Sequence, residues 1–143
     1  MVPPLRLAVV MTPLESTGSK PRMLLVEDEA VVVAALRKFF VRQGFTVDCA
    51  RELEEAEAMI ATSHYEVVIA DLRLSWSYAI EGLDILRFVR QNSHTTRVII
   101  LTAHATPDIR RGARDLGADA FLLKPLPLPE IAATVHQLTA VAR

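Results

Sequence analysis

The stretch "VVIADLRLSWSYAIEGLDIL", residues 67–86, decides how this chain folds. Its first four residues are apolar and run directly into the carboxylate of Asp71. A short, near-continuous apolar run is typical of a strand buried on both faces of a parallel sheet. After Asp71 we expect a long, partly aromatic loop, with helical periodicity resuming at Gly82. The stretch raises the question of why a buried strand would end on a charge.

The composition indicates one compact domain and excludes several classes of protein. The chain has 143 residues, 51% of them hydrophobic, which is enough for one core but too few residues for two ordinary domains. Its 16 basic and 17 acidic residues leave no positive surplus for a nucleic-acid backbone, so we expect no direct nucleic-acid binding. The single cysteine, Cys49, excludes an intrachain disulfide and is expected to be a buried structural thiol. The four histidines are scattered, and we expect them at the surface.

The N-terminal segment differs from the rest of the chain. Residues 1–21 hold four of the eight prolines and show no periodicity, which predicts a flexible tail before a folded domain at 22–143. No apolar run approaches the roughly 18 residues that a membrane-spanning helix needs, and the flanks of a signal peptide are missing. The expected location is therefore the reducing cytoplasm, with no membrane partner.

From Met23 onward, apolar segments of strand length alternate with segments of helical periodicity. Five strands are predicted, at 23–27, 46–50, 66–70, 97–101 and 120–124. Each is followed by an apolar stripe that suits a helix lying on a sheet: Val32, Leu36, Phe39 and Phe40; Leu53, Ala56 and Ile60; Leu83, Leu86 and Val89; Ile109, Ala113 and Leu116; Ile131, Val135 and Leu138. Gly44 and Gly117 stand where helices should stop, and Thr106 before Pro107 is typical of a helix start.

Four of the predicted strands end on polar side chains. Glu27 and Asp28 end the first strand, Asp71 the third, Thr102 the fourth and Lys124 the fifth. The carboxyl ends of parallel strands share one edge of a sheet, where ligands bind in the crevice at which the strand order reverses. If the order is 2-1-3-4-5, this reversal lies between the first and third strands, which carry all three acids.

Such a cluster of acids needs compensating positive charge. Each pair of carboxylates would repel by about 4 kcal/mol at about 4 Å, for an effective dielectric constant of about 20. Protonation of one acid would relieve this, but Mg²⁺ is the more economical solution for a few carboxylates with phosphate and water. Lys124 would add a positive charge beside Asp71, and Thr102 a hydroxyl donor. The site suits a phosphoryl group on an aspartate, since phosphoryl transfer needs mainly positioning and charge neutralisation.

Four motifs stand at these strand ends: "LLVEDE", "VVIADL", "VIILTAH" and "GADAFLLKP". Each motif is weak alone, but with all four in this order residues 22–139 resemble the receiver domain of two-component response regulators. The expected fold class is therefore α/β, a flavodoxin-like doubly wound sheet of five parallel strands in the order 2-1-3-4-5, with helices on both faces.

The resemblance implies a role for each acid. Asp71 would be the phosphoacceptor. Glu27, Asp28, Asp71 and the backbone carbonyl of Arg73 would bind Mg²⁺, the one cofactor expected. Considered alone, Asp71 also suits a solvated strand-end acid, and the acidic pair also suits the start of a helix.

The resemblance also implies roles around the phosphoryl group. Thr102 and Lys124 would contact its oxygens, and Phe121 would be an aromatic switch whose ring turns inward when Thr102 moves. Arg73 and His104 occupy positions that look out over the path of the attacking water, so we predict that they tune the phosphoryl lifetime. A cis peptide bond is expected between Lys124 and the proline that follows it.

The segment after Asp71 departs from the family pattern. It carries extra residues, and Ser75 stands where the family usually has proline. Trp76, Tyr78 and Ile80 add apolar bulk beside the crevice. They either pack on the neighbouring helix or on each other, or form a lid or partner contact.

We interpret the chain as a single-domain receiver, a phosphorylation-controlled switch rather than an enzyme. Its phosphoryl donor would be a sensor histidine kinase or a histidine phosphotransfer protein. The resemblance implies a downstream protein partner at the face formed by the fourth helix, fifth strand and fifth helix, where Arg110, Arg111 and Arg114 make either a contact patch or a solvated face. A homodimer is left open.

Other interpretations are a degenerate receiver that never carries phosphate and the N-terminal fragment of a longer regulator. A phosphatase with an aspartyl-phosphate is disfavoured, because position 73 is Arg where a second acid is needed. A flavin or dinucleotide binder is also disfavoured, because "EDEAVV" after the first strand is acidic rather than rich in Gly, Ser or Thr.

Overall fold

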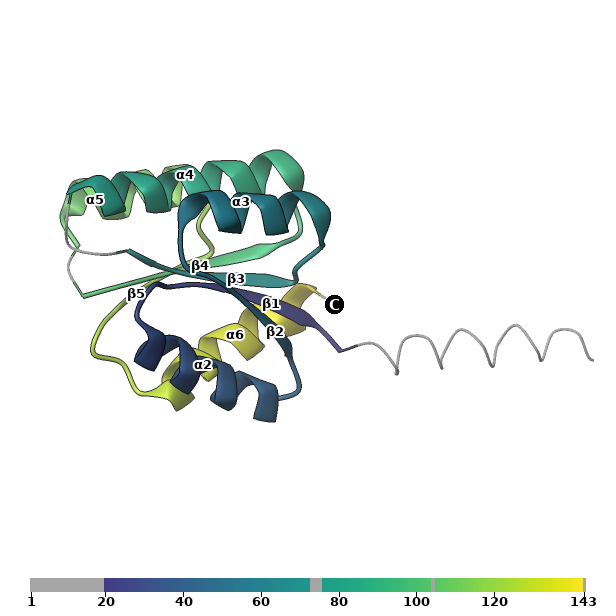
Figure 1. The fold of residues 1–143 in the computed structure, drawn as a ribbon. Helices are drawn as coiled ribbons and strands as arrows, with labels where there is room; N and C mark the ends of the chain where they lie inside the picture. The colour runs from purple at the N-terminus through teal and green to yellow at the C-terminus, as the bar shows by residue number, and fades with distance from the viewer. Residues whose placement is uncertain (1–19, 73–75, 104, 143) are drawn as a thin grey trace, which may run out of the picture.

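A five-stranded parallel sheet forms the centre of the protein (Figure 1). The computed structural model describes residues 20–72, 76–103 and 105–142, without the side chains of 72–82 and 140–142. The strand order is β2-β1-β3-β4-β5. The strands are β1 (Arg22–Val26), β2 (Thr46–Ala50), β3 (Val67–Leu72), β4 (Arg97–Thr102) and β5 (Ala120–Leu123). The predicted fold class and strand order are therefore confirmed.

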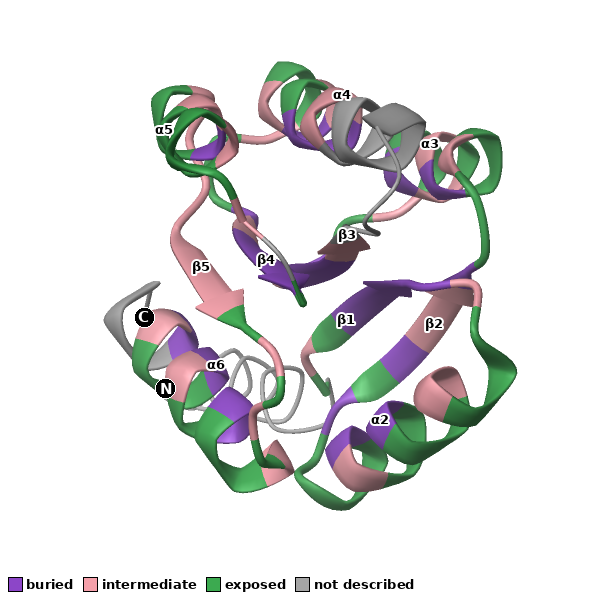
Figure 2. Ribbon diagram, turned by 90° about the vertical axis from the view of Figure 1, so that its left-hand side faces the viewer, coloured by how far each residue is buried: buried purple, intermediate pink, exposed green. Residues whose placement is uncertain are grey.

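Helices cover both faces of the sheet (Figure 2). One face is covered by α2 (Ala30–Arg42) and α6 (Leu128–Ala142). The other is covered by α3 (Leu53–Thr62), α4 (Trp76–Asn92) and α5 (Pro107–Asp115). None of the described helices is long and apolar enough to cross a membrane.

The core consists of two apolar clusters separated by the sheet. Because successive strand residues point to opposite faces, Leu24 and Val68 pack with the α3, α4 and α5 side, whereas Met23 and Val67 pack with the α2 and α6 side. All four side chains are fully buried. Burial of a large apolar side chain contributes about 1.5–3 kcal/mol, so the packing of these side chains stabilises the central strands.

Local sequence signals place the ends of several helices. The Thr106 side chain accepts a hydrogen bond of 3.1 Å from the backbone N–H of Ile109, with Pro107 in the first turn of α5, as predicted. Gly44 and Gly117 both have φ of +99°, the left-handed conformation that ends helices on glycine. These turns send the chain back to begin β2 and β5.

One prediction about local structure was wrong. The segment after Asp71 was expected to stay a loop until Gly82, but α4 already begins at Trp76. No proline interrupts residues 76–92, and a single glycine inside a helix costs only about 1 kcal/mol. The aromatic and serine residues between Trp76 and Gly82 had suggested a loop, but this segment forms the first turns of α4. The predicted lid or partner contact falls on side chains outside the described set.

Candidate functional site

The pairing of β1 with β3 brings two of the predicted site acids together. Val26 lies opposite Ala70 in the parallel register, so Glu27 and Asp71 follow at the same level of neighbouring strands. The backbone N–H of Glu27 also donates to the carbonyl of Ala50 at 2.9 Å, which extends the ladder with β2. The carboxyl ends of the strands thus form one edge of the sheet, the edge that faces the viewer in Figure 2.

The same edge receives Thr102 and Lys124. Thr102 pairs with Leu72 on β3 and is 1% exposed, which places its hydroxyl one residue beyond Asp71 on the adjacent strand. The backbone N–H of Lys124 donates to the carbonyl of Thr102 at 2.7 Å. The peptide bond from Lys124 to Pro125 is cis, as expected.

An ion pair joins the last strand to the third. The Lys124 ammonium donates to Oδ2 of Asp71, and its Nζ lies 3.8 Å from Oε1 of Glu27. The side chains of Asp71 and Glu27 are 7% and 2% exposed, against 26% for Lys124. One partly exposed ammonium therefore faces two buried carboxyl groups, and the predicted convergence of these three residues is observed.

The electrostatics of Glu27 reflect this imbalance. The pKa of Glu27 is raised to about 8, first by burial and then by the hydrogen bond with Asp71. The backbone N–H of Glu29, which donates to Oε2 of Glu27 at 2.9 Å, and the charge of Lys124 both act in the opposite direction. The raised pKa favours the neutral form of Glu27, which would relieve part of its repulsion with Asp71.

The donor set suits a hard cation, although its geometry differs from a finished metal site. Two buried carboxyl groups, with the half-buried Asp28 next in sequence, provide the oxygen ligands that Mg²⁺ prefers. Within the described part of the chain, no three His, Cys, Asp or Glu side chains are arranged closely enough to hold a metal ion. The predicted carbonyl ligand of Arg73 and the predicted tuning residue His104 lie outside the described residues.

Phe121, the predicted switch residue, lies on β5. It pairs with Ile100 on β4, so it shares the face of the sheet that Thr102 occupies two residues further along. Its ring packs partly buried against the core, and the guanidinium carbon of Arg110 lies 5.1 Å from the ring centroid. The contact between Arg110 and Phe121 was not predicted, because nothing in the local sequence of either element signals a cation–π pair across 11 residues.

The residues to which no role in the phosphoryl site was assigned mostly have the predicted exposure. The described histidines, His64, His94 and His136, are exposed, as are all three arginines of α5. Arg111 pairs with Asp108 at 3.2 Å. Cys49 is only half-buried rather than fully buried, because it lies on the edge strand β2; burial raises the pKa of its thiol.

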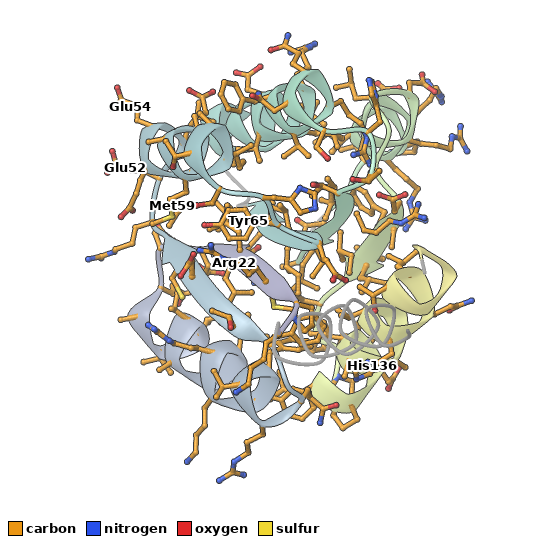
Figure 3. All side chains as sticks on the ribbon, turned by 90° about the vertical axis from the view of Figure 1, so that its right-hand side faces the viewer. Arg22, Glu52, Glu54, Met59, Tyr65 and His136 are labelled. Carbon is orange, nitrogen blue, oxygen red and sulfur yellow. The ribbon has the colours of Figure 1, made fainter. Side chains whose placement is uncertain are left out.

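The amino edge of the sheet, where the strands begin, carries two polar clusters that were not predicted from the sequence. Asp48 accepts hydrogen bonds of 2.7 Å from both Arg22 and the Tyr65 hydroxyl; Arg22 and Tyr65 lie side by side in Figure 3. Asp119 accepts from Arg90, Arg97 and the backbone N–H of Val98. The sequence predicts where each acid lies relative to a strand. It does not predict the partners, which come from segments distant in the sequence.

The fold and this edge define a class of protein: a doubly wound α/β domain with buried acids and a lysine gathered at the carboxyl ends of its strands. The family model of the response regulator receiver domain matches residues 23–136. The chain belongs to this family.

Curated relatives match the chain in sequence. The transcriptional regulatory protein PmrA of Pectobacterium parmentieri is 38% identical over 117 residues, which cover 82% of this chain and 51% of the relative. The transcriptional regulatory protein QseB of Haemophilus influenzae is 34% identical over 117 residues, which cover 82% of this chain and 52% of the relative. The chain spans about half the length of these curated relatives.

Solved structures match its fold. The signal receiver domain of a putative LuxO repressor protein from Vibrio parahaemolyticus has a TM-score of 0.77 and 28% identity, covering 87% of this chain and 93% of that one. A CheY-like receiver domain protein from Methanospirillum hungatei has a TM-score of 0.80 at 20% identity, covering 87% and 97%, respectively.

Proposed function

We propose that Asp71 accepts a phosphoryl group from the phosphohistidine of a sensor histidine kinase or a histidine phosphotransfer protein. The observation that carries this proposal is the buried pair of Glu27 and Asp71, which share the single ammonium of Lys124 at the carboxyl edge of the sheet. This site holds a surplus of acid that additional positive charge would stabilise.

In the proposed reaction an oxygen of Asp71 attacks the phosphorus in line. The bond from phosphorus to the donor histidine nitrogen breaks, and the electron pair stays on the imidazole. Lys124 moves from the Asp71 carboxylate to a phosphoryl oxygen, and the Thr102 hydroxyl donates to another. Glu27, Asp28, Asp71 and the Arg73 carbonyl would hold Mg²⁺, which when bound neutralises charge on the carboxylates and the phosphoryl oxygens.

The proposed output is a conformational signal rather than catalysis. Movement of Thr102 toward the phosphoryl group opens space on the face that Phe121 shares, and the ring turns inward. This alters the surface of α5, β5 and α6, where a downstream protein partner is proposed to bind. Arg73 and His104 are proposed to set the lifetime of the phosphoryl group. Single-residue changes of either to Ala are expected to alter the dephosphorylation rate. The proposed location of the protein is the cytoplasm.

The proposal is tested by incubation with acetyl phosphate and Mg²⁺, followed by intact-mass measurement. We expect the parent chain to gain the mass of one phosphoryl group, and Asp71→Asn to gain none. Chelation of the metal should suppress the gain. Asp115→Asn, an exposed acid on α5, is the matched control and should label like the parent. A parent chain that never labels would instead favour a receiver that works without phosphate.

A further inference from the structure

Helices α2 and α3 segregate charge by sign. Every charged residue of α2 is basic: Arg37, Lys38 and Arg42. Every charged residue of α3 is acidic, and an acid also precedes it at the N-cap: Glu52, Glu54, Glu55 and Glu57. Like charges three or four residues apart destabilise an isolated helix, as Lys38 with Arg42 and Glu54 with Glu57 would. Both helices would therefore be stabilised by a surface of the opposite sign.

The two charged surfaces flank the same lateral edge of the sheet, which is formed by the outermost strand β2. Figure 2 shows α2 and α3 on opposite faces beside β2, and among the described strands β2 pairs only with β1. The charges of Arg37 on α2 and Glu55 on α3 both act on the thiol of Cys49, so both side chains lie near this residue of β2. This edge thus presents a basic half and an acidic half side by side.

Apolar surface accompanies the charges. Val41, one turn beyond Arg37, is 48% exposed. On the other side the partly buried Met59 follows Glu55 by one turn, and Figure 3 shows Glu52 and Glu54 directed outward, with Met59 on the β2 side of α3. Each half of the edge therefore combines charged side chains with an apolar neighbour, as the contact surfaces of weak dimers do.

We propose that this edge binds a second copy of the chain, with α2 of each protomer against α3 of its partner. A two-fold axis parallel to β2 exchanges the two faces of the sheet but keeps every residue at its level along the strand. Arg37 then meets Glu55 of the other copy, and the symmetry repeats this contact. A single chain carries both complementary halves beside the same strand, which favours a second copy over a partner of one charge.

This dimer is independent of the phosphoryl group. The residues that form it, led by Arg37, Val41 and Glu55, take no part in the site at Glu27, Asp71 and Lys124. Asp71→Asn should therefore dimerise like the parent, so the dimer and the proposed phosphorylation succeed or fail separately.

The test is sedimentation equilibrium of the 143-residue chain from micromolar to millimolar concentration. We expect a monomer–dimer equilibrium that weakens as salt rises, because exposed ion pairs are screened. Arg37→Glu should raise the dimer dissociation constant by about tenfold or more, since it replaces two symmetric attractions with repulsions. The double variant Arg37→Glu with Glu55→Arg should recover most of the affinity. Arg114→Glu, on α5 at the opposite edge, makes the same charge change and should have no effect.

A second swap keeps the test valid if Glu55→Arg disturbs the start of α3, where the Glu55 carboxylate accepts from the backbone N–H of Arg51 at 2.7 Å. Far-UV circular dichroism detects such a disturbance, and Glu52→Arg then replaces Glu55→Arg. A parent chain that stays monomeric throughout overturns the proposal. So does equal weakening by Arg114→Glu, or failure of both swaps to recover affinity in folded protein.

Discussion

The carboxyl edge and the amino edge of the sheet treat their acids in opposite ways. At the carboxyl edge, Glu27 and Asp71 both lie within 4 Å of the Lys124 ammonium, and the pKa of Glu27 is raised to about 8, mainly by burial. At the amino edge, Asp48 has two donors of its own, Tyr65 and Arg22, and the Tyr65 hydroxyl in particular lowers the pKa of Asp48.

The second acid of the amino edge, Asp119, follows the same pattern. It accepts from two guanidinium groups and one backbone N–H, and its side chain is 17% exposed. Acids at the amino edge are therefore satisfied within the protein and contribute to stability. At the carboxyl edge, the buried carboxyl groups of Glu27 and Asp71 lie beside one partly exposed ammonium, an arrangement expected of a site that receives charge from outside.

The largest effect is expected from Lys124→Ala. Loss of the only ammonium close to Asp71 in the described structure should slow labelling by acetyl phosphate by about a hundredfold or more, because the charge of the phosphoryl group would lack its partner. Lys38→Ala, which removes an exposed ammonium from α2, is the control. The labelling rate followed by intact mass decides it, and equal rates for Lys124→Ala and the parent would show that the ion pair is only structural.

Asp119→Ala should destabilise the protein at the amino edge of the sheet. Its removal leaves Arg90 and Arg97 without their carboxylate and the backbone N–H of Val98 without its acceptor, so the free energy of unfolding should fall by about 2–3 kcal/mol. Urea denaturation measures the loss. The fraction of folded protein that labels should stay at the parent level. A stable Asp119→Ala variant with impaired labelling would reverse the roles assigned to the two edges.

The pH dependence of stability should separate the edges further. A carboxyl group whose pKa is raised on folding binds more protons in the folded chain than in the unfolded one, so stability falls as pH rises. In the metal-free chain, Glu27 should make stability decline between its ordinary pKa of 4.5 and about 8, by about 1 kcal/mol per pH unit. Glu27→Gln should flatten this decline, as should Mg²⁺. Thermal unfolding across this pH window provides the measurement, and a decline that is unchanged in Glu27→Gln would assign it to another group.

The smallest effect is expected from Tyr65→Phe. Loss of its 2.7 Å hydrogen bond to Asp48 should cost about 1 kcal/mol at neutral pH. Since the pKa of Asp48 is lowered on folding, its contribution is present above its ordinary pKa of 3.8 and is lost as pH falls. The difference between Tyr65→Phe and the parent should therefore shrink in acid, as measured by urea denaturation. A constant difference would mean that the hydroxyl acts independently of the Asp48 charge.

The carboxyl edge could be predicted from the sequence, and the amino edge could not. Alternation of strands and helices fixes which end of each strand carries Glu27, Asp71, Thr102 and Lys124, so their convergence follows from the topology. The contacts of Asp119 with Arg90 depend on where a helix 29 residues away ends. No local pattern encodes such a distance.

The start of α4 shows a second limit of the sequence. Residues 76–81 lack a strong helix signal, and the structure nevertheless makes them helical. Propensity differences of a few tenths of a kcal/mol decide little when the following turns already pack on the sheet. The sequence predicted the crowding of acids around Glu27, but the ion pairing with Lys124 and the raised pKa of Glu27 follow only from the structure.

Peptide mapping by mass spectrometry of the chain labelled with acetyl phosphate and Mg²⁺ tests the central claim most directly. The account predicts a single phosphoryl group on the peptide that contains Asp71, located on its carboxylate. A label on any other residue, or a labelled Asp71→Asn chain, would contradict it.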